Sequence, residues 1–145
     1  MDPTMDTSFA QILQGLESGL PLLLLHFGAT LALFFVGVAV YVAVTPMHER
    51  ELLANGNQAA GIVLGGTVVA LAIPLAATLA TSLALADIVI WGTVALILQL
   101  FTFLIAIWLF RDLRTMIETG NVAAGTALAG LQIAVALLNA GAMAG

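Results

Sequence analysis

Cysteine and lysine are both missing from this chain of 145 residues, and charged side chains of any kind are scarce. Without cysteine there is no disulfide, no thiol nucleophile and no cysteine-ligated metal. Only three residues are positively charged and the net charge is −5, which argues against nucleic acid binding, because that needs clustered cations. Charged residues make up 8% of the chain, against about 25% in soluble domains, too few to cover a water-soluble globule.

Long apolar segments fill most of the sequence, with 62% hydrophobic residues and a mean hydropathy of +1.16. Four segments lack Asp, Glu, Lys and Arg, and each has the ~20 residues that a helix needs to cross a bilayer. They are Pro21–Val44, Ala59–Ala86, Ile88–Phe110 and Val122–Ala142. Lipid offers the backbone no hydrogen-bond partners, so continuous runs of this length predict helices. We therefore expect an all-α integral membrane protein with four transmembrane helices, surrounded by the lipid bilayer.

The second half of the chain resembles the first at an offset of 64 residues. Gly56-Asn57-Gln58-Ala59-Ala60-Gly61 aligns with Gly120-Asn121-Val122-Ala123-Ala124-Gly125. Because each copy contains two spans, both copies enter the membrane in the same direction, which predicts two tandem parallel helical-hairpin repeats. The expected division is a tail at 1–20, a first repeat at 21–86 and a second repeat at 87–145.

The tail before the first span has a helical pattern of its own. Its apolar residues recur at helical spacing with polar residues between them: Phe9, Ile12, Leu13, Leu16 and Leu20. The pattern predicts a short N-terminal amphipathic helix, which lies in the membrane interface or packs as a lid on the end of the bundle.

All three arginines lie in the two short connections between paired spans: Arg50 in the first, Arg111 and Arg114 in the second. Short loops rich in Arg stay cytoplasmic, so both termini are expected outside. The charged stretches Glu49–Glu51 and Arg111–Glu118 are also candidate contacts for a cytoplasmic partner. Their mixed charges are equally what any solvated loop would show.

Polar residues and proline mark the helix ends and one helix interior. Asn57 and Asn121 are placed as N-caps of the second and fourth spans, and the alternative is that the two helix N-termini attract an anion or a lipid headgroup. Pro74 removes a backbone donor and predicts a kink in the second span, with nearby threonines able to bond the freed carbonyls. Asp87 is expected to cap the third span, or alternatively to hold an outer cation.

A stripe of small and polar side chains follows one face of each of the last two spans. Its polar members are Gln99, Thr102, Gln132 and Asn139, and both glutamines fall near mid-bilayer. A glutamine there costs free energy unless it is bonded, so we expect the two to meet or to share a partner. Such interhelical bonds contribute about 0.6 kcal/mol on average. The alternative is that the four residues line a narrow polar path.

The sequence contains no nucleophile–base pair, phosphate loop or set of metal ligands, and no carboxylate in the central membrane. Neither an enzyme nor a bound cofactor is expected. Two hypotheses remain: an oligomeric pore or permeation component for ions or small solutes, and a membrane-embedded scaffold that binds a cytoplasmic partner. The first requires a homo-oligomer, because four helices are too few to enclose a wide path.

Most of the chain resembles a known family. The similarity is carried by Tyr41, Thr45-Pro46, Glu49, Gly56-Asn57-Gln58-Ala59-Ala60, Pro74-Leu75, Trp91-Gly92, Gln99-Leu100 and Leu137-Leu138-Asn139-Ala140. Over residues 22–143 the chain looks like the YjfL-like membrane proteins of prokaryotes, a domain of unknown function present in two copies. The resemblance implies four spans in two hairpins and an inner-membrane location. It also implies a setting near envelope-stress and polyamine-related genes, with a cytoplasmic stress-response protein as candidate partner. It assigns no activity and no catalytic residue.

Overall fold

The computed structural model describes residues 3–45 and 47–145, with side chains described from Phe9 onward. The described chain is helical, in the order α1 (Pro3–Val44), α2 (Glu49–Ala54), α3 (Gln58–Thr81), α4 (Leu85–Leu109), α5 (Leu113–Glu118) and α6 (Val122–Ala144). Helices α1, α3, α4 and α6 are long and apolar enough to cross a membrane. The expectation of an all-helical chain with four candidate spans is confirmed.

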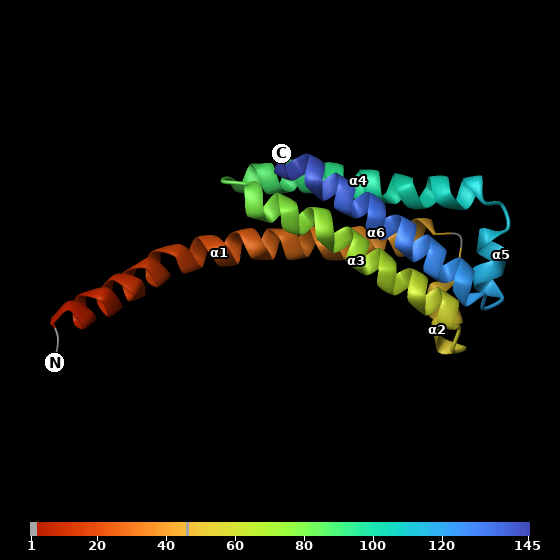
Figure 1. The fold of residues 1–145 in the computed structure, drawn as a ribbon, viewed down its shortest axis with the longest axis horizontal. Coiled ribbons are helices and arrows are strands. Elements are labelled where there is room, and N and C mark those ends of the chain that lie inside the picture. Colours follow the sequence, from red (N-terminus) through yellow and green to blue (C-terminus); the bar gives the residue numbers. More distant parts are fainter. Residues whose placement is uncertain (1–2, 46) are drawn as a thin grey trace.

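Helices α3 and α6 run parallel through the bundle, with their N-termini side by side (Figure 1). Small residues let their backbones approach closely. A Cβ atom added to Gly125 would lie 2.7 Å from the carbonyl oxygen of Ala59, and one added to Gly66 would lie 2.4 Å from the Cβ of Ala129. Lipid tails are as apolar as the helices, so close packing of this kind, rather than the hydrophobic effect, holds such helices together.

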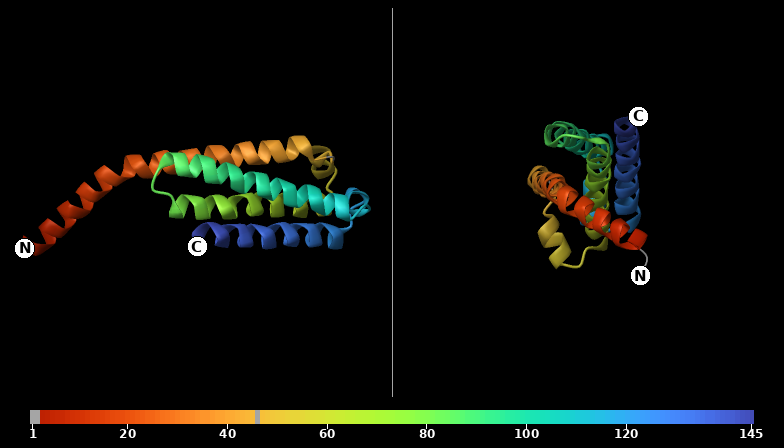
Figure 2. Two further views of the ribbon diagram at one scale, coloured as in Figure 1. Left: turned by 90° about the horizontal axis from the view of Figure 1, so that it is seen from above. Right: turned by 90° about the vertical axis from the view of Figure 1, so that its left-hand side faces the viewer.

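Helices α1 and α4 also run parallel and contact each other along one side of the bundle (Figure 2). Near the connections, the rings of Tyr41 and Phe103 pack edge to face with centroids 4.8 Å apart. Farther along, a Cβ atom added to Gly37 would lie 2.7 Å from the side chain of Leu96. The hairpin formed by α1 and α3 therefore points in the same direction as the hairpin formed by α4 and α6.

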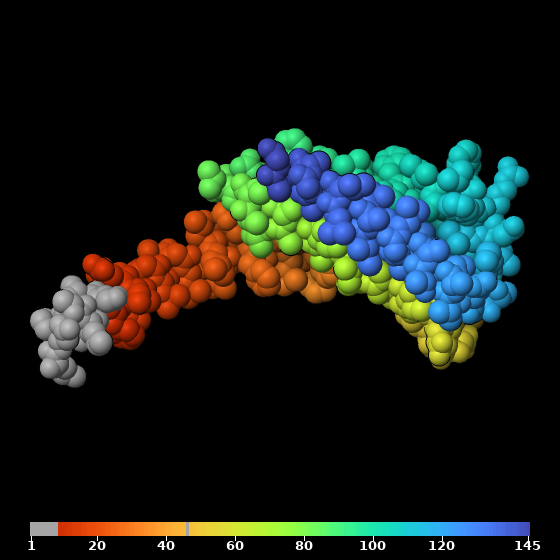
Figure 3. Space-filling model, in the orientation of Figure 1, coloured from red at the N-terminus to blue at the C-terminus, as the bar shows by residue number. Residues whose placement is uncertain are grey.

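Helix α1 is a single helix of 42 residues, which corresponds to about 63 Å at 1.5 Å per residue. The sequence predicted a separate amphipathic helix ending at residue 20, but the structure has no break there and Pro21 lies inside α1. The N-terminal half of α1 curves away from the other helices and projects past the end of the bundle where the C-terminus lies (Figures 1 and 3). Every side chain from Phe9 to Leu25 is exposed. Its position in the membrane interface stays a prediction.

The turns that lead into α3 and α6 have the same conformation. Gly56 and Gly120 have φ angles of 76° and 86°, in the left-handed region that glycine adopts without steric cost. The amide of Gly56 donates to the carbonyl of Leu53, and that of Gly120 to the carbonyl of Ile117, both at 2.9 Å. Helices α2 and α5, which precede these turns, have matching lengths of six residues.

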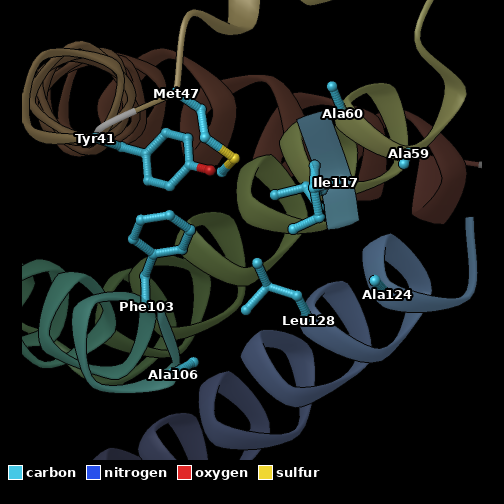
Figure 4. Packing of buried hydrophobic residues seen from close by; sticks show 10 residues of the cluster. Tyr41, Met47, Ala59, Ala60, Phe103, Ala106, Ile117, Ala124 and Leu128 are labelled. Carbon is cyan, nitrogen blue, oxygen red and sulfur yellow. The ribbon is translucent and has the colours of Figure 1, made fainter. Parts of the chain in front are cut away.

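A cluster of buried apolar side chains closes the end of the bundle that carries α2 and α5 (Figure 4). Tyr41 and Phe103 come from the two outer helices, Leu128 from α6, and Met47 and Ile117 from the two connections. Each connection therefore contributes an apolar side chain to this cluster. This packing fixes the positions of the polar groups that lie beside the cluster.

Candidate functional site

Three buried polar side chains meet in the middle of the bundle. The Thr67 hydroxyl of α3 lies 2.9 Å from Oε1 of Gln132 on α6. Nε2 of Gln99 on α4 donates to the backbone carbonyl of Gln132 at 2.8 Å. All three side chains are at most 2% exposed. The two glutamines thus link three helices, with Thr67 as the additional partner that the polar stripe did not include.

The hydrogen-bonding capacity of these side chains is only partly used. Oε1 of Gln99 and Nε2 of Gln132 are buried and have no hydrogen-bond partner among the described residues. The single Thr67 proton cannot serve both Gln132 and the Val63 carbonyl, which also lies at 2.9 Å. Turning the Gln132 amide would let its nitrogen donate to Thr67, but its oxygen would then be left over. In either orientation, each glutamine keeps one free polar atom in the bundle interior.

A second group of buried polar side chains lies at the end of the bundle that carries the connections. The hydroxyl of Tyr41 is buried without a well-formed hydrogen bond, and Figure 4 shows it directed into the cluster beside Met47. Thr45 and Thr67 lie beside this hydroxyl, and the carboxyl of Glu49 is nearby. Glu49 is only 3% exposed, and its Oε1 has no hydrogen-bond partner in the part of the chain that the structure describes. This corrects the expectation that Glu49 is part of a solvated loop.

Together these side chains form a continuous arrangement that we name the polar row: Glu49, Thr45, Tyr41, Thr67, Gln132 and Gln99. All four buried side-chain atoms that lack partners in the described chain belong to it. Buried polar groups in folded proteins are nearly always paired, so each exception requires an explanation.

A cavity of about 560 Å³ opens at the opposite end of the bundle, where α3 ends and α4 begins. We name it the outer cavity. Its polar lining includes Thr78, Thr81, Asp87 and Asn139, and Trp91 and Leu98 form part of its apolar wall. Leu98 precedes Gln99, and Asn139 lies seven residues beyond Gln132, about 10 Å along α6. The outer cavity therefore lies on the side of the polar row that ends in Gln132 and Gln99.

The predicted stripe members do not all share one environment. Gln99 and Gln132 belong to the row, and Nδ2 of Asn139 donates to the Ala95 carbonyl of α4 at 3.4 Å while lining the outer cavity. Thr102 differs, because its hydroxyl donates at 3.0 Å to Leu98 in its own helix. Thr102 lies three residues after Gln99 on roughly the same side of α4. The offset between them is nevertheless enough that Thr102 bonds within α4 and Gln99 bonds Gln132.

The helix ends differ in part from the sequence expectations. Asn57 and Asn121 occupy the N-caps of α3 and α6 and accept from the amides of Ala60 and Ala124 at 3.0 and 3.1 Å. Asp87 was expected to cap α4, but the N-cap is Ala84 and Asp87 lies in the first turn, which leaves its side chain free to line the outer cavity. The boundary predicted between residues 86 and 87 accordingly falls inside α4.

Pro74 is accommodated within α3, which continues to Thr81. The carbonyl that loses its amide partner belongs to Ala70, four residues earlier. The nearby Thr78 hydroxyl donates to the carbonyl of Pro74 itself at 2.9 Å, so it does not satisfy the carbonyl of Ala70.

The arginines all lie in the connections, away from the polar row. Arg114 pairs with Glu118 at 2.7 Å within α5, while Arg50 and Arg111 are exposed. The row therefore has a carboxyl group, Glu49, at the end beside the connections, and the outer cavity contributes a second one, Asp87. No group of three potential metal ligands occurs in the part of the chain that the structure describes.

Sequence reasoning missed Tyr41 and Thr45 as members of a site, and it considered Glu49 only as a contact for a cytoplasmic partner or as part of a solvated loop. The spacing of four residues places Thr45 beside Tyr41 at the end of α1, whereas Glu49 begins α2 and reaches them only through the turn between the two helices. The charge pattern gave no signal for its burial, because Glu49 stands between His48 and Arg50 in a stretch of charged residues. Only the packing of the connection against α3 distinguishes a buried carboxyl there from a solvated one.

Comparison with known proteins adds a family assignment. A family model described as Domain of Unknown Function (DUF350) matches residues 15–143. The UPF0719 inner membrane protein YjfL of Escherichia coli K12 is 32% identical over 119 residues, covering 77% of this chain and 90% of the relative. The protein of the same name from Escherichia coli O157:H7 matches to the same extent. No solved structure matches the chain. Since the match spans nearly all of the bundle, from the N-terminal half of α1 to the end of α6, the chain belongs to the DUF350 family.

Proposed function

We propose that the chain is an inner-membrane permeation component in which the polar row connects the outer cavity to the end that carries α2 and α5. The location is that named for the Escherichia coli relatives. The observation that supports the function is the set of four buried atoms without a hydrogen-bond partner among residues 3–45 and 47–145, all of which belong to one row. Interhelical bonding alone would account for the Thr67–Gln132 contact, but it leaves these four atoms without a role.

The energetic argument concerns the cost of leaving polar atoms unpaired. A buried donor or acceptor without a partner costs about 1–3 kcal/mol, and apolar residues of similar shape would avoid that cost. Polar residues inside membrane segments commonly mark pathways for substrates and ions. A row of such atoms between an open cavity and a buried carboxyl fits a passage whose contents supply the missing partners.

The proposed orientation places the outer cavity outside the cell and the connections in the cytoplasm. It is supported by the location of Arg50, Arg111 and Arg114 in the connections and by the positive-inside rule. We also propose that the two hairpins arose as tandem repeats. The parallel packing of α1 with α4 and of α3 with α6, and the matching turns at Gly56 and Gly120, support this origin.

The passage proposed here lies within one chain, which revises the requirement for an oligomer. Gln99, Gln132 and Thr67 are in direct hydrogen-bond contact, so only a small species can move along the row. A homo-oligomer stays part of the proposal because broad apolar surfaces, including Phe101, Ile105 and Trp108 on α4, are exposed. Lipid or a second copy would cover such surfaces equally well, and counting subunits in nanodiscs distinguishes the two.

Flux measurements on purified protein in liposomes test the proposal. Gln99→Leu and Gln132→Leu replace the central polar side chains by apolar ones of similar size and are expected to abolish flux. Thr102→Val is the matched control, because its hydroxyl bonds only within α4, and it should conduct like wild type. Equal flux from wild-type and empty vesicles for protons, alkali cations and small neutral solutes would rule out a permeation function.

The second candidate is a scaffold that binds a cytoplasmic stress-response protein. A shallow apolar groove beside Arg111, lined by Leu113, Met116 and Ala124, is the observation that favours it. Binding to a purified candidate partner should then be lost in Arg111→Ala and kept in Arg114→Ala, since Arg114 is already paired with Glu118. Unchanged binding in Arg111→Ala would rule out this groove as the contact surface for the partner.

A further inference from the structure

We infer that the outer cavity is a binding site for a small organic cation, namely a singly charged substituted ammonium ion. This inference goes beyond the proposed function, because it concerns binding in the outer cavity and not movement along the polar row. Four features of the structure support it: the size of the cavity, the sign of the charge around it, a carboxylate without an ionic partner in the described structure, and an aromatic wall beside that carboxylate.

The outer cavity has the size of a small-molecule site. Its volume of about 560 Å³ lies within the range of about 300–1,000 Å³ that is usual for ligand pockets. Residues of α3, α4 and α6 line it, so three helices that are separate in the sequence converge around one space. A few polar groups among apolar walls are typical of ligand sites, and here hydroxyl, amide and carboxyl groups share the lining with Val94 and Met143.

The helix ends around the outer cavity favour positive charge. Helices α3 and α6 end at this side of the bundle, where α4 begins (Figure 1). The lining residues Thr81 and Met143 belong to the last turns of α3 and α6. A helix has about half a negative charge at its C-terminus and about half a positive charge at its N-terminus. Two C-terminal ends therefore outweigh one N-terminal end, and Asp87 adds a full negative charge.

Asp87 is the one charged side chain in the described lining of the outer cavity. It is exposed in the first turn of α4, so its carboxylate is accessible to a ligand. The single salt bridge among the described residues joins Arg114 to Glu118 in α5, at the other end of the bundle. One carboxylate balances one positive charge. A divalent metal ion needs several oxygen ligands close together, so the arrangement favours a monovalent organic cation.

An aromatic and apolar wall continues from Asp87 along α4. Trp91, Val94 and Leu98 follow Asp87 by four, seven and eleven residues, a spacing that places all four on one face of the helix. A single ligand can therefore contact both the carboxylate and the indole ring. The face of an indole attracts ammonium ions, and this attraction is the usual means of recognising substituted ammonium ligands. The aliphatic side chains offer contacts to alkyl groups on the ligand, which a bare alkali ion lacks.

Helices α3 and α6 add hydrogen-bond acceptors to the outer cavity. Thr78 and Thr81 donate their only hydroxyl protons at 2.9 Å to the carbonyls of Pro74 and Ala77, so their oxygens remain able to accept. Nδ2 of Asn139 donates to the Ala95 carbonyl, which leaves the amide oxygen as a further acceptor. Acceptors of this kind suit a ligand that carries N–H or O–H groups, and they do not suit an anion.

Tryptophan fluorescence of the full chain tests this inference, in dodecyl maltoside micelles that contain neither tryptophan nor an ammonium group. The sequence has two tryptophans, so Trp108→Phe leaves Trp91 as the reporter. Choline is the probe, and it should change the Trp91 emission along a saturable curve. The uncharged analogue of choline, in which carbon replaces nitrogen, should cause no such change. Potassium chloride at the same concentration controls for ionic strength and should also have no effect.

Variants locate the site. In the Trp108→Phe background, Asp87→Asn should weaken the affinity for choline by about fivefold or more, because it removes the attraction between two unit charges. Asp112→Asn is the matched control, since it neutralises an exposed aspartate at the opposite end of the bundle, and it should leave the affinity unchanged. Trp91→Phe with Trp108 retained should give no fluorescence response, because Trp108 lies near the other end of α4.

The ammonium group can belong to a free solute or to a lipid headgroup, and adding phosphatidylcholine to the micelles distinguishes the two. A response to choline identifies a soluble ligand, and a response to phosphatidylcholine alone identifies a headgroup. No response to either, or equal affinity for choline in Asp87→Asn and its parent, would overturn the inference. Choline binding without flux in liposomes would keep this inference and remove the proposed function, and flux without binding would do the reverse.

Discussion

The side-chain amide of Asn57 donates to the backbone carbonyl of Ile117 at 2.9 Å, across the boundary between the two hairpins. It also donates to the carbonyl of Glu118 at 3.0 Å, while its oxygen caps α3. One side chain thus satisfies the N-terminus of α3 and the C-terminal carbonyls of α5. In the described structure Asn121, its counterpart 64 residues later, makes the cap but no matching bond to α2.

This asymmetry predicts unequal effects of two equivalent substitutions. Asn121→Ala should lower the free energy of unfolding by about 1 kcal/mol, the usual contribution of an N-cap. Asn57→Ala should cost at least about 1 kcal/mol more, because it also removes two hydrogen bonds. Unfolding by SDS titration in mixed micelles measures both. Equal losses would show that the bonds to α5 contribute nothing to stability.

The close contact of α3 with α6 predicts opposite effects of two glycine substitutions. Gly66→Ala places a Cβ atom 2.4 Å from that of Ala129, so the helices must separate, at a cost of about 1–3 kcal/mol. Gly130→Ala adds its methyl group to open space and should be neutral or stabilising, by up to about 1 kcal/mol from helix propensity. Thermal unfolding in detergent compares them. A stable Gly66→Ala protein would contradict the packing described here.

The raised pKa of Glu49 predicts how stability depends on pH. The folded state holds the Glu49 proton more tightly than the unfolded chain, so stability is greatest below the unfolded value of 4.5 and declines as pH rises through the folded pKa. This decline should be missing from Glu49→Gln and present in Glu51→Gln. Melting temperatures over a pH series in detergent provide the measurement. Parallel pH profiles of Glu49→Gln and wild type would argue against a buried, exchanging carboxyl.

The contact between Thr67 and Gln132 predicts a modest coupling energy. Thr67→Val and Gln132→Leu each remove one partner, and a double-mutant cycle isolates the pair. Interhelical bonds in membranes average about 0.6 kcal/mol in such cycles, so we expect a value of that order. A coupling near zero would mean that the two side chains do not bond. If these variants lose flux although their stability changes this little, the loss of flux results from the change in the passage and not from unfolding.

The class and the helices followed from the sequence because lipid imposes a simple requirement. A backbone without water must bond to itself, so charge-free runs such as 122–142 become helices wherever they pack. The N-caps at Asn57 and Asn121 could also be predicted from the sequence, since capping depends on residues within one turn of the helix end. The continuous α1 could not be predicted, because a proline at position 21 is compatible both with a helix start and with a helix interior.

The composition and order of residues by themselves determined the membrane class and the four helices that can span a bilayer, because these depend on the length and charge of local segments. The tertiary structure decided which polar groups share an environment. It separated Thr102 from Gln99, joined Thr67 to Gln132, and buried Glu49 beside Tyr41 although its neighbours Arg50 and Glu51 are exposed. Burial and pairing depend on which helices lie against each other, and residues such as Tyr41 and Thr67, distant along the chain, become neighbours only when α1 packs on α3.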